Sequence, residues 1–434
     1  MARHGAVCAG AGPMSGAVPT KEACAAIAHA GVGAHIVATA GCGTPTTLLR
    51  ALSKHAAGRA WTLSSGLLLG EYSFVPQVRS GDLRYLTWHV MPPVRDLVAA
   101  GAAQYSPIRA SHLAAILQRR GVDVALARIS TPDRHGYVSV GPSASYALDA
   151  LRLASVRIGE VDPQLPRTFG DTAVHKTVFD AMIDSADPTP VYTSAPPGEV
   201  SARIAEHVLA VMPQDPTLQI GIGAIPEAVV SALATADLGQ VRFAGLVTDD
   251  MVDLFDLGVI PRSCGGPVFV SPELMGSAKL MQFADRNPAV GVYPSSVAHD
   301  PVRLGRSPRF VSLNTAIEVD LGGQVNSEAI GGRQVAGIGG SLDFADAAAR
   351  SIDGMGIIAL PSTTPRGISR IVASAATVTI PRSMIDVVVT EYGVARIGGR
   401  DVAERTEALI GIAHPDHRDR LREQSVALVG AADR

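Results

Sequence analysis

Short β-rich runs alternate with amphipathic helical stretches along almost the whole chain, and turns rich in glycine or proline separate them. This alternation is typical of α/β proteins built on parallel sheets. A length of 434 residues is enough for two or three domains of this kind. Strands are predicted at 241–247, 356–361 and 385–390, and helices at about 272–285, 341–352 and 401–412.

The best candidate for a linker is the segment 188–198, which is rich in proline and has no hydrophobic period. On each side of it a predicted strand ends in a Gly-x-Gly turn before a helix, at Gly41–Gly43 and at Gly221–Gly223. We therefore expect two open α/β domains of similar plan, 1–187 and 199–434, with the active site in the cleft between them.

Composition and charge exclude several classes of protein. Hydrophobic residues make up 47% of the chain, which excludes global disorder, and the net charge of −3 gives no basic surface for nucleic acid. No apolar run approaches the roughly 18–20 residues that span a bilayer, so no membrane segment is expected. The four cysteines, Cys8, Cys24, Cys42 and Cys264, form no CxxC pair. We expect no disulfide framework, no bound metal and a cytoplasmic location.

Two glycine-rich turns precede predicted helices. The first runs from Gly221 through Gly223 and Ile225 to Pro226; the second contains Gly337, Gly339 and Gly340. Such turns let backbone N–H groups approach a phosphate or a developing oxyanion, and the start of the helix adds its dipole. A dinucleotide site stays open for the first turn, although Pro226 stands where that fingerprint has a third glycine. The alternative for both turns is a glycine-rich bend without a ligand.

Three side chains are weaker candidates for acid–base chemistry. His135 follows a buried strand in a tight turn, where a structural histidine is the alternative. Glu318 and Asp320 lie two residues apart on a predicted strand, so their carboxyl groups share one face. They could equally form salt bridges with some of the many arginines. His414 and His417 lack a third ligand nearby, so they do not predict a metal site.

Several longer segments resemble the acetyl-CoA hydrolase/transferase family. They include GIGAIPEAVVSAL, VSLNTAIEVDLGGQVNSE, GIGGSLDF and DVVVTEYGVARIGGR. The resemblance implies two α/β domains with the active site between them, coenzyme A or acyl-CoA as substrate, an acyl or CoA acceptor, and a homo-oligomer. It further implies that the N–H of Ile225 and that of Gly339 or Gly340 stabilise the oxyanion.

The sequence departs from the family at the catalytic glutamate. In the transferases this glutamate attacks the acyl-CoA and forms a glutamyl-CoA thioester. When MVDLFDLGVI is aligned with the family's corresponding helix, Gly245 falls at that position. Glycine has no side chain and cannot form a covalent intermediate. Asp249, four residues further on, is the nearest carboxylate.

The sequence therefore predicts an acyl-CoA enzyme that acts by hydrolysis or by direct acyl transfer. Two alternatives remain open. One is an ordinary carboxylate CoA-transferase that uses another glutamate, and the other is a non-catalytic acyl-CoA binding protein. For the first prediction, Asp249, Glu318 and His135 are the candidate general bases.

Overall fold

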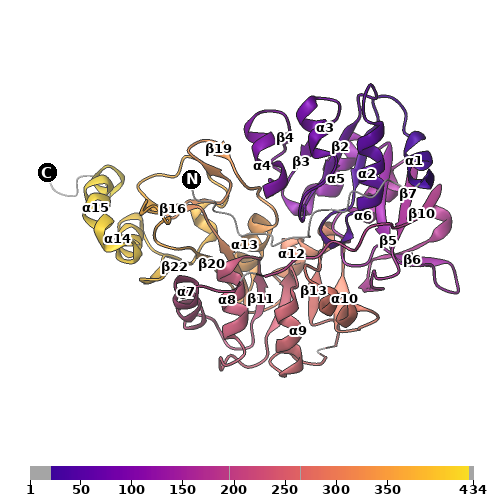
Figure 1. Cartoon of the computed structure of the whole chain (residues 1–434). Coiled ribbons are helices and arrows are strands. Elements are labelled where there is room, and N and C mark those ends of the chain that lie inside the picture. Colours follow the sequence, from indigo (N-terminus) through magenta and orange to yellow (C-terminus); the bar gives the residue numbers. More distant parts are fainter. Residues whose placement is uncertain (1–20, 195, 264, 430–434) are drawn as a thin grey trace.

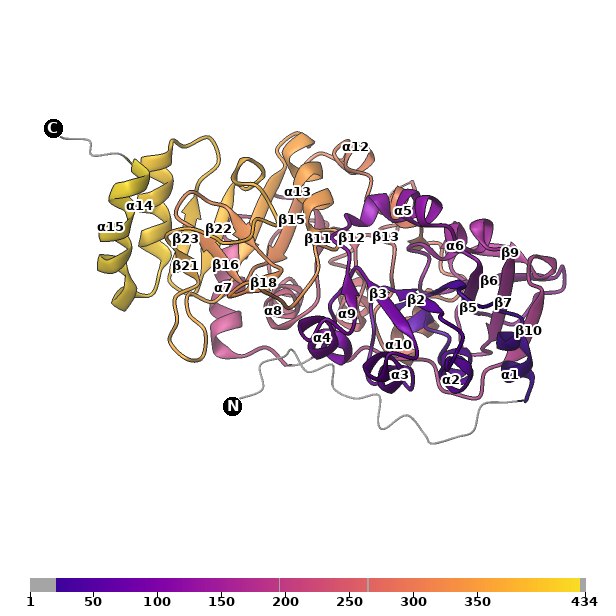
Figure 2. The same ribbon diagram turned by 90° about the horizontal axis from the view of Figure 1, so that it is seen from above.

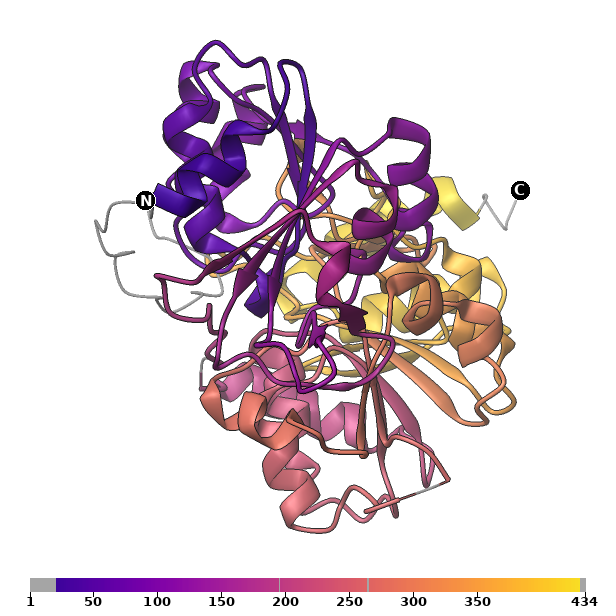
Figure 3. The same ribbon diagram turned by 90° about the vertical axis from the view of Figure 1, so that its right-hand side faces the viewer.

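The computed structural model describes residues 21–194, 196–263 and 265–429. It has two halves, each built on a parallel or mostly parallel sheet with helices on its faces (Figure 1), and this confirms the predicted α/β class. The first half lies above the second in Figure 3, and α14 and α15 lie at the end of the second half away from the first (Figure 1).

The first half contains a seven-stranded sheet with strand order β10-β7-β5-β1-β2-β3-β4, in which every neighbouring pair is parallel. Its strands are β1 (His35–Ala38), β2 (Thr62–Ser65), β3 (Arg84–Thr87), β4 (Gln104–Tyr105), β5 (Val124–Ile129), β7 (Val156–Val161) and β10 (Ala181–Asp184).

Helices cover both faces of this sheet, with four on one face and two on the other (Figure 2). The first group is α1 (Lys21–Ala28), α2 (Thr46–His55), α3 (Val75–Ser80) and α4 (Pro92–Ala99), and the second is α5 (Leu113–Arg120) and α6 (Ala147–Leu153). Short strands β6 (Tyr137–Ser139) and β9 (Ala173–His175) form a separate antiparallel pair. Short 3₁₀ helices lie at Gly41–Gly43, Ala110–His112, Lys176–Val178 and Arg382–Met384.

The second half contains a nine-stranded sheet with strand order β23-β22-β20-β15-β11-β12-β13-β14-β8. Only the pair β22–β23 is antiparallel. The strands are β8 (Phe169–Gly170), β11 (Thr217–Ile220), β12 (Arg242–Gly245), β13 (Phe269–Ser271), β14 (Val290–Val292), β15 (Phe310–Thr315), β20 (Met355–Ala359), β22 (Val387–Thr390) and β23 (Gly393–Arg396).

The second half contains helices before, between and after its strands. They are α7 (Glu199–Leu209), α8 (Ala224–Ala232), α9 (Asp249–Asp256), α10 (Ala278–Ala284), α11 (Ser295–Ala298), α12 (Pro301–Leu304), α13 (Ser341–Arg350), α14 (Val402–Ile412) and α15 (Pro415–Val429). There are also two small sheets. One consists of β16 (Glu318–Asp320), β17 (Val325–Asn326) and β21 (Ile371–Val372), and the other consists of β18 (Ala329–Ile330) and β19 (Arg333–Gln334). None of the helices in the described part of the chain has the length and apolar character that a membrane span requires.

Strand β8 connects the two halves. It precedes the proline-rich segment 188–198 in the sequence, yet it pairs with β14 at the edge of the second sheet. The largest cluster of buried apolar side chains also crosses between the halves and includes both Val37 and Val389. The division into domains at 188–198 stays a prediction.

Most predicted elements are present with shifted ends. The strands expected at 241–247, 356–361 and 385–390 are β12, β20 and β22, and the helices expected at 341–352 and 401–412 are α13 and α14.

The helix predicted at 272–285 is wrong over 272–277. Helix α10 begins only at Ala278, where the Ser277 hydroxyl accepts a hydrogen bond from the N–H of Lys279. Before it, Glu273 and Leu274 form β-bridges with Ser143 and Val247. This segment therefore lies against both halves of the molecule instead of coiling.

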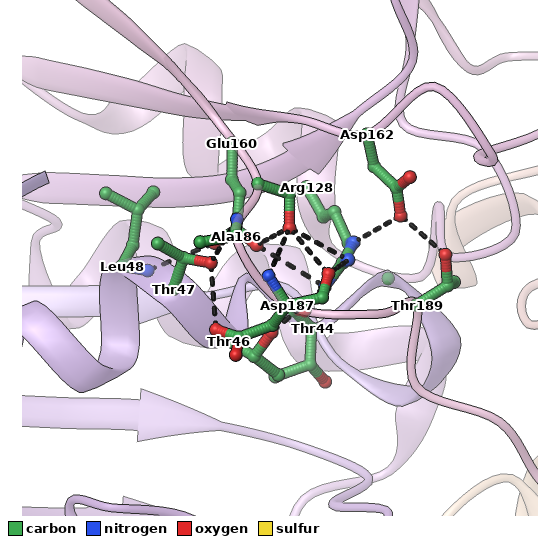
Figure 4. A network of polar contacts seen from close by, with 12 residues as sticks. Thr44, Thr46, Thr47, Leu48, Arg128, Glu160, Asp162, Ala186, Asp187 and Thr189 are labelled. Carbon is green, nitrogen blue, oxygen red and sulfur yellow. Dashed lines mark hydrogen bonds and ion pairs between the residues drawn. The ribbon is translucent and has the colours of Figure 1, made fainter. Parts of the chain in front are cut away.

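The buried strand β5 carries an arginine, Arg128, whose side chain has no exposed surface. Its guanidinium donates to Asp162 at 2.8 Å and lies 3.4 Å from Glu160, which is also fully buried. It also donates to the carbonyl oxygens of Thr44 and Asp187 (Figure 4). The network thereby fixes the start of the segment 188–198 to β5 and to the turn before α2.

Candidate active site

A cavity of about 280 Å³ lies where the two halves meet. It opens at the carboxyl ends of β2, β3, β11, β12 and β13, which is where ligands bind in open α/β sheets. Its walls are mostly aliphatic, and its polar side chains come from His89, Ser145, Gln219, Glu273, Ser295, His299, Asn314 and Ser341. A mostly apolar cavity into which several polar groups converge is the usual form of a small-molecule site.

The second glycine-rich turn forms one wall of this cavity. Gly337, Gly339 and Gly340 all line it, and the carbonyl oxygen of Gly339 accepts a hydrogen bond from the N–H of Ala110 in the first half. Gly340 directly precedes α13, where N–H groups have no partner within the helix. A Cβ atom at Gly340 would lie 2.5 Å from Nε2 of His299, so this position requires glycine.

The first glycine-rich turn reaches the cavity only with its first two residues, Gly221 and Ile222. Gly221 lines the wall, whereas Gly223 and Ile225 lie beyond it at the start of α8. Glu227, which the sequence analysis did not identify, accepts hydrogen bonds from the N–H of Gly223 and the hydroxyl of Tyr192. The roles of Ile225 and the two turns in holding an oxyanion or CoA stay predictions.

Gly245 is the last residue of β12 and is buried beside the cavity wall. Its φ of +90° lies in the region that favours glycine. A Cβ atom there would lie 3.2 Å from Cγ of Gln219 and 3.3 Å from Cζ of Phe344, and both of these residues line the cavity. A side chain at position 245 would therefore contact two residues of the cavity wall.

The weaker candidates from the sequence lie elsewhere. Asp249 accepts hydrogen bonds from the N–H groups of Ser277 and Leu280 and so caps α10. Glu318 accepts from the side-chain amide of Asn326 in a small sheet. His135 is exposed in the turn between β5 and β6. None of the three lines the cavity.

Glu273, which the sequence analysis missed, does line the cavity. Burial raises the pKa of its carboxyl group to about 8, although contacts with the hydroxyls of Ser143 and Ser145 lower the pKa in part. One carboxyl oxygen, Oε2, makes no hydrogen bond to any described residue. A Cβ atom at Gly41 would lie 3.1 Å from this oxygen, so the carboxyl lies between the two halves.

Two further ionisable groups in the cavity are the imidazoles of His89, which is half-buried, and of His299, which is buried. Burial lowers the pKa of each to about 4, so both are neutral near pH 7. Nδ1 of each ring lacks a hydrogen-bond partner among the described residues. His299 packs against the Phe344 ring with 4.8 Å between centroids. In the described part of the chain, no group of three or more His, Cys, Asp and Glu side chains is arranged to hold a metal ion.

The fold and the cavity define an α/β protein with a small-molecule site between its two halves. Family models for the N-terminal and C-terminal domains of acetyl-CoA hydrolase/transferase match residues 19–192 and 276–425. The chain belongs to the acetyl-CoA hydrolase/transferase family, and its relatives are CoA-transferases and acetyl-CoA hydrolases, which supports the predicted acyl-CoA enzyme.

Curated relatives agree with this assignment, and a solved structure has the same fold. The 4-hydroxybutyrate coenzyme A transferase of Clostridium kluyveri is 35% identical over 82% of this chain and 85% of its own length. Succinyl-CoA:acetate/propanoyl-CoA:succinate CoA transferase of Fasciola hepatica is 34% identical over 90% of this chain and 84% of its own length. The crystal structure of RipA from Yersinia pestis superimposes with a TM-score of 0.86 at 26% identity, covering 94% of this chain and 97% of that one.

Proposed function

We propose that this protein cleaves acyl-CoA thioesters by direct attack of water or another acceptor, without a glutamyl-CoA intermediate. The observation that carries the proposal is Gly245, which has no side chain, lies beside the cavity and falls at the family's nucleophile position when the following helix motif is aligned. The glycine turn at Gly339 and Gly340 offers N–H groups for the thioester oxygen. Removing one such donor typically costs about 10²–10³ in rate, so the turn can support catalysis without a covalent step.

A carboxylate CoA-transferase that uses another glutamate is the second candidate. Glu273 favours it, because it is a glutamate in the same cavity, and it directly follows β13, the strand next to the one that carries Gly245. A covalent role would require its carboxylate to reach the thioester carbon. The two functions give different products from the same substrate.

Product analysis by mass spectrometry distinguishes them. Purified protein is incubated with a panel of short acyl-CoAs, with and without acetate or succinate. We expect free CoA, or an acylated non-carboxylate acceptor, independently of the added carboxylate. A new acyl-CoA that forms only with the carboxylate, together with a borohydride-trapped glutamyl-CoA thioester, would overturn the proposal. Bound CoA with no turnover of any thioester would also overturn it and indicate a binding protein.

Restoring the family's residue is a second test. Gly245→Glu should create carboxylate-dependent CoA exchange, since the new side chain starts 3.2–3.3 Å from two cavity-lining residues. The positive φ makes the substitution strained by about 1–3 kcal/mol, which a thermal melt would detect. Gly245→Gln carries the same strain without the nucleophile and should show no exchange. If Gly245→Glu folds and binds CoA but exchange stays at the Gln level, the assignment of position 245 is wrong.

Cytoplasmic location and assembly into a homo-oligomer stay predictions of the sequence.

A further inference from the structure

The cavity contains three ionisable side chains that the family's covalent step does not explain: Glu273, His89 and His299. The two imidazoles are weak bases, because burial lowers the pKa of each to about 4. A direct attack by water needs a base that removes a proton as the new bond forms. Among the described residues that line the cavity, Glu273 is therefore the strongest base when ionised.

The position of Glu273 suits this task. It comes from the segment between β13 and α10, next to the end of β12, where Val247 pairs with Leu274. Its carboxyl is fully buried, and Oε2 lacks a hydrogen-bond partner among the described residues. Buried polar atoms are normally paired, so an unpaired one needs an explanation. A bound water or acceptor hydroxyl would supply the missing partner.

The described groups around Glu273 do not compensate the negative charge of its ionised carboxyl. Cys42 and Tyr146 lie close enough to interact with it electrostatically, and burial raises the pKa of both, for Cys42 to about 12. No lysine or arginine is found among the described residues that line the cavity. The carboxyl can therefore gain and lose a proton without breaking an ion pair.

We infer that Glu273 is the proton carrier of this site: it takes a proton from the attacking water or acceptor and returns it to the sulfur of CoA. This inference rests on the proposed function. The water oxygen bonds to the thioester carbon, its proton passes to the Glu273 carboxylate, and the carbonyl electrons move to the oxygen. When the carbon–sulfur bond breaks, the thiolate takes the proton back, which leaves a carboxylic acid, CoA thiol and an ionised Glu273.

Nearby groups would hold the substrate for this step. The turn at Gly339 and Gly340 provides N–H groups for the oxyanion, and His89 lies beside it, with Nε2 3.3 Å from the place of a Gly339 Cβ. A neutral imidazole can donate an N–H to a carbonyl oxygen. Glu273 and this turn line the same cavity of about 280 Å³, so one thioester can contact both.

The test compares Glu273→Gln with wild type on a turned-over acyl-CoA. The amide has the size of the carboxyl but cannot carry a proton, so kcat should fall by about 10²–10⁴-fold. Wild-type kcat/KM should rise with pH until about pH 8 and then level off. The residual activity of the variant should lack this rise. Glu391→Gln, at a half-buried glutamate bonded to Ser362 outside the cavity, should keep wild-type rates and pH profile.

Hydroxylamine separates a proton-transfer role from a structural one. It is a strong nucleophile that attacks thioesters without a base, so the deficit of Glu273→Gln should shrink at least tenfold when hydroxylamine replaces water. An equal deficit with both nucleophiles, or an unchanged pH profile, would overturn the role of Glu273 and leave the proposed function intact. A glutamyl-CoA thioester trapped on Glu273 of the wild type would overturn both. If the variant fails to fold, the wild-type pH profile decides alone, since a flat profile between pH 6 and 8 contradicts the inference.

Discussion

Replacing Arg128 by methionine should lower the free energy of unfolding by about 3–5 kcal/mol. The guanidinium is fully buried and bonds to Asp162 and lies beside Glu160. Its removal leaves carboxylates in a dry interior without their cation, and that loss exceeds the gain from an apolar side chain of similar length. The midpoint of denaturant unfolding, followed by circular dichroism, measures the effect.

Two control variants show whether burial of the charge is the cause. Arg128→Met combined with Glu160→Gln removes one unpaired charge and should recover part of the lost stability. Arg203→Ala removes an exposed arginine paired with Glu199 and should change stability by less than about 0.5–1 kcal/mol. A loss below 1 kcal/mol for Arg128→Met would mean that the network is not important for stability.

Glu273 should make the protein less stable as the pH rises. In the unfolded chain this carboxyl ionises near its ordinary pKa of 4.5, whereas in the fold its pKa is about 8. Between these values the folded state binds more protons, so the free energy of unfolding falls by up to about 1.4 kcal/mol for each pH unit. This stability is fully present below pH 4.5 and is lost as the pH rises through 8.

Glu273→Gln removes this dependence, so it should be several kcal/mol more stable than wild type at pH 8.5 and closest to it at pH 5. Thermal melts of both proteins at pH 5, 6, 7 and 8.5 test the prediction, with Glu391→Gln as a variant that should follow wild type. His89 has the opposite effect on the pH dependence of stability. Its pKa is 6.5 in the unfolded chain and about 4 in the fold, so the stability that its neutral form contributes is lost as the pH falls through 4. If the stabilities of wild type and Glu273→Gln change with pH in the same way, the burial assigned to the Glu273 carboxyl is wrong.

The α/β class and most elements could be predicted because hydrophobic patterns and turn residues are local signals. The family motifs also placed the Gly337–Gly340 turn, which the structure brings to the cavity wall. The sequence does not single out Glu273, because the segment 272–285 is predicted to be a helix and no neighbouring residue marks its role. Its surroundings come from segments far away in the sequence, Gly41 and Ser143 among them.

Candidate residues chosen only by their chemical type do not line the cavity. Asp249 was selected as the nearest carboxylate to Gly245, yet both of its oxygens accept backbone N–H groups near the start of α10. A capping aspartate and a catalytic one have the same local sequence, and only tertiary contacts separate them. A signal that could have found Glu273 is a single charge inside a mostly apolar segment that directly follows a strand.

Strand β8 determines how the two halves can move. The chain passes from β7 in the first sheet to β8 in the second, returns to β10, and leaves again for β11. Three covalent crossings prevent the halves from swinging apart on a single hinge, as two domains joined by one linker can. The cavity wall is therefore formed when the chain folds, and a ligand of this cavity would enter a site that already exists.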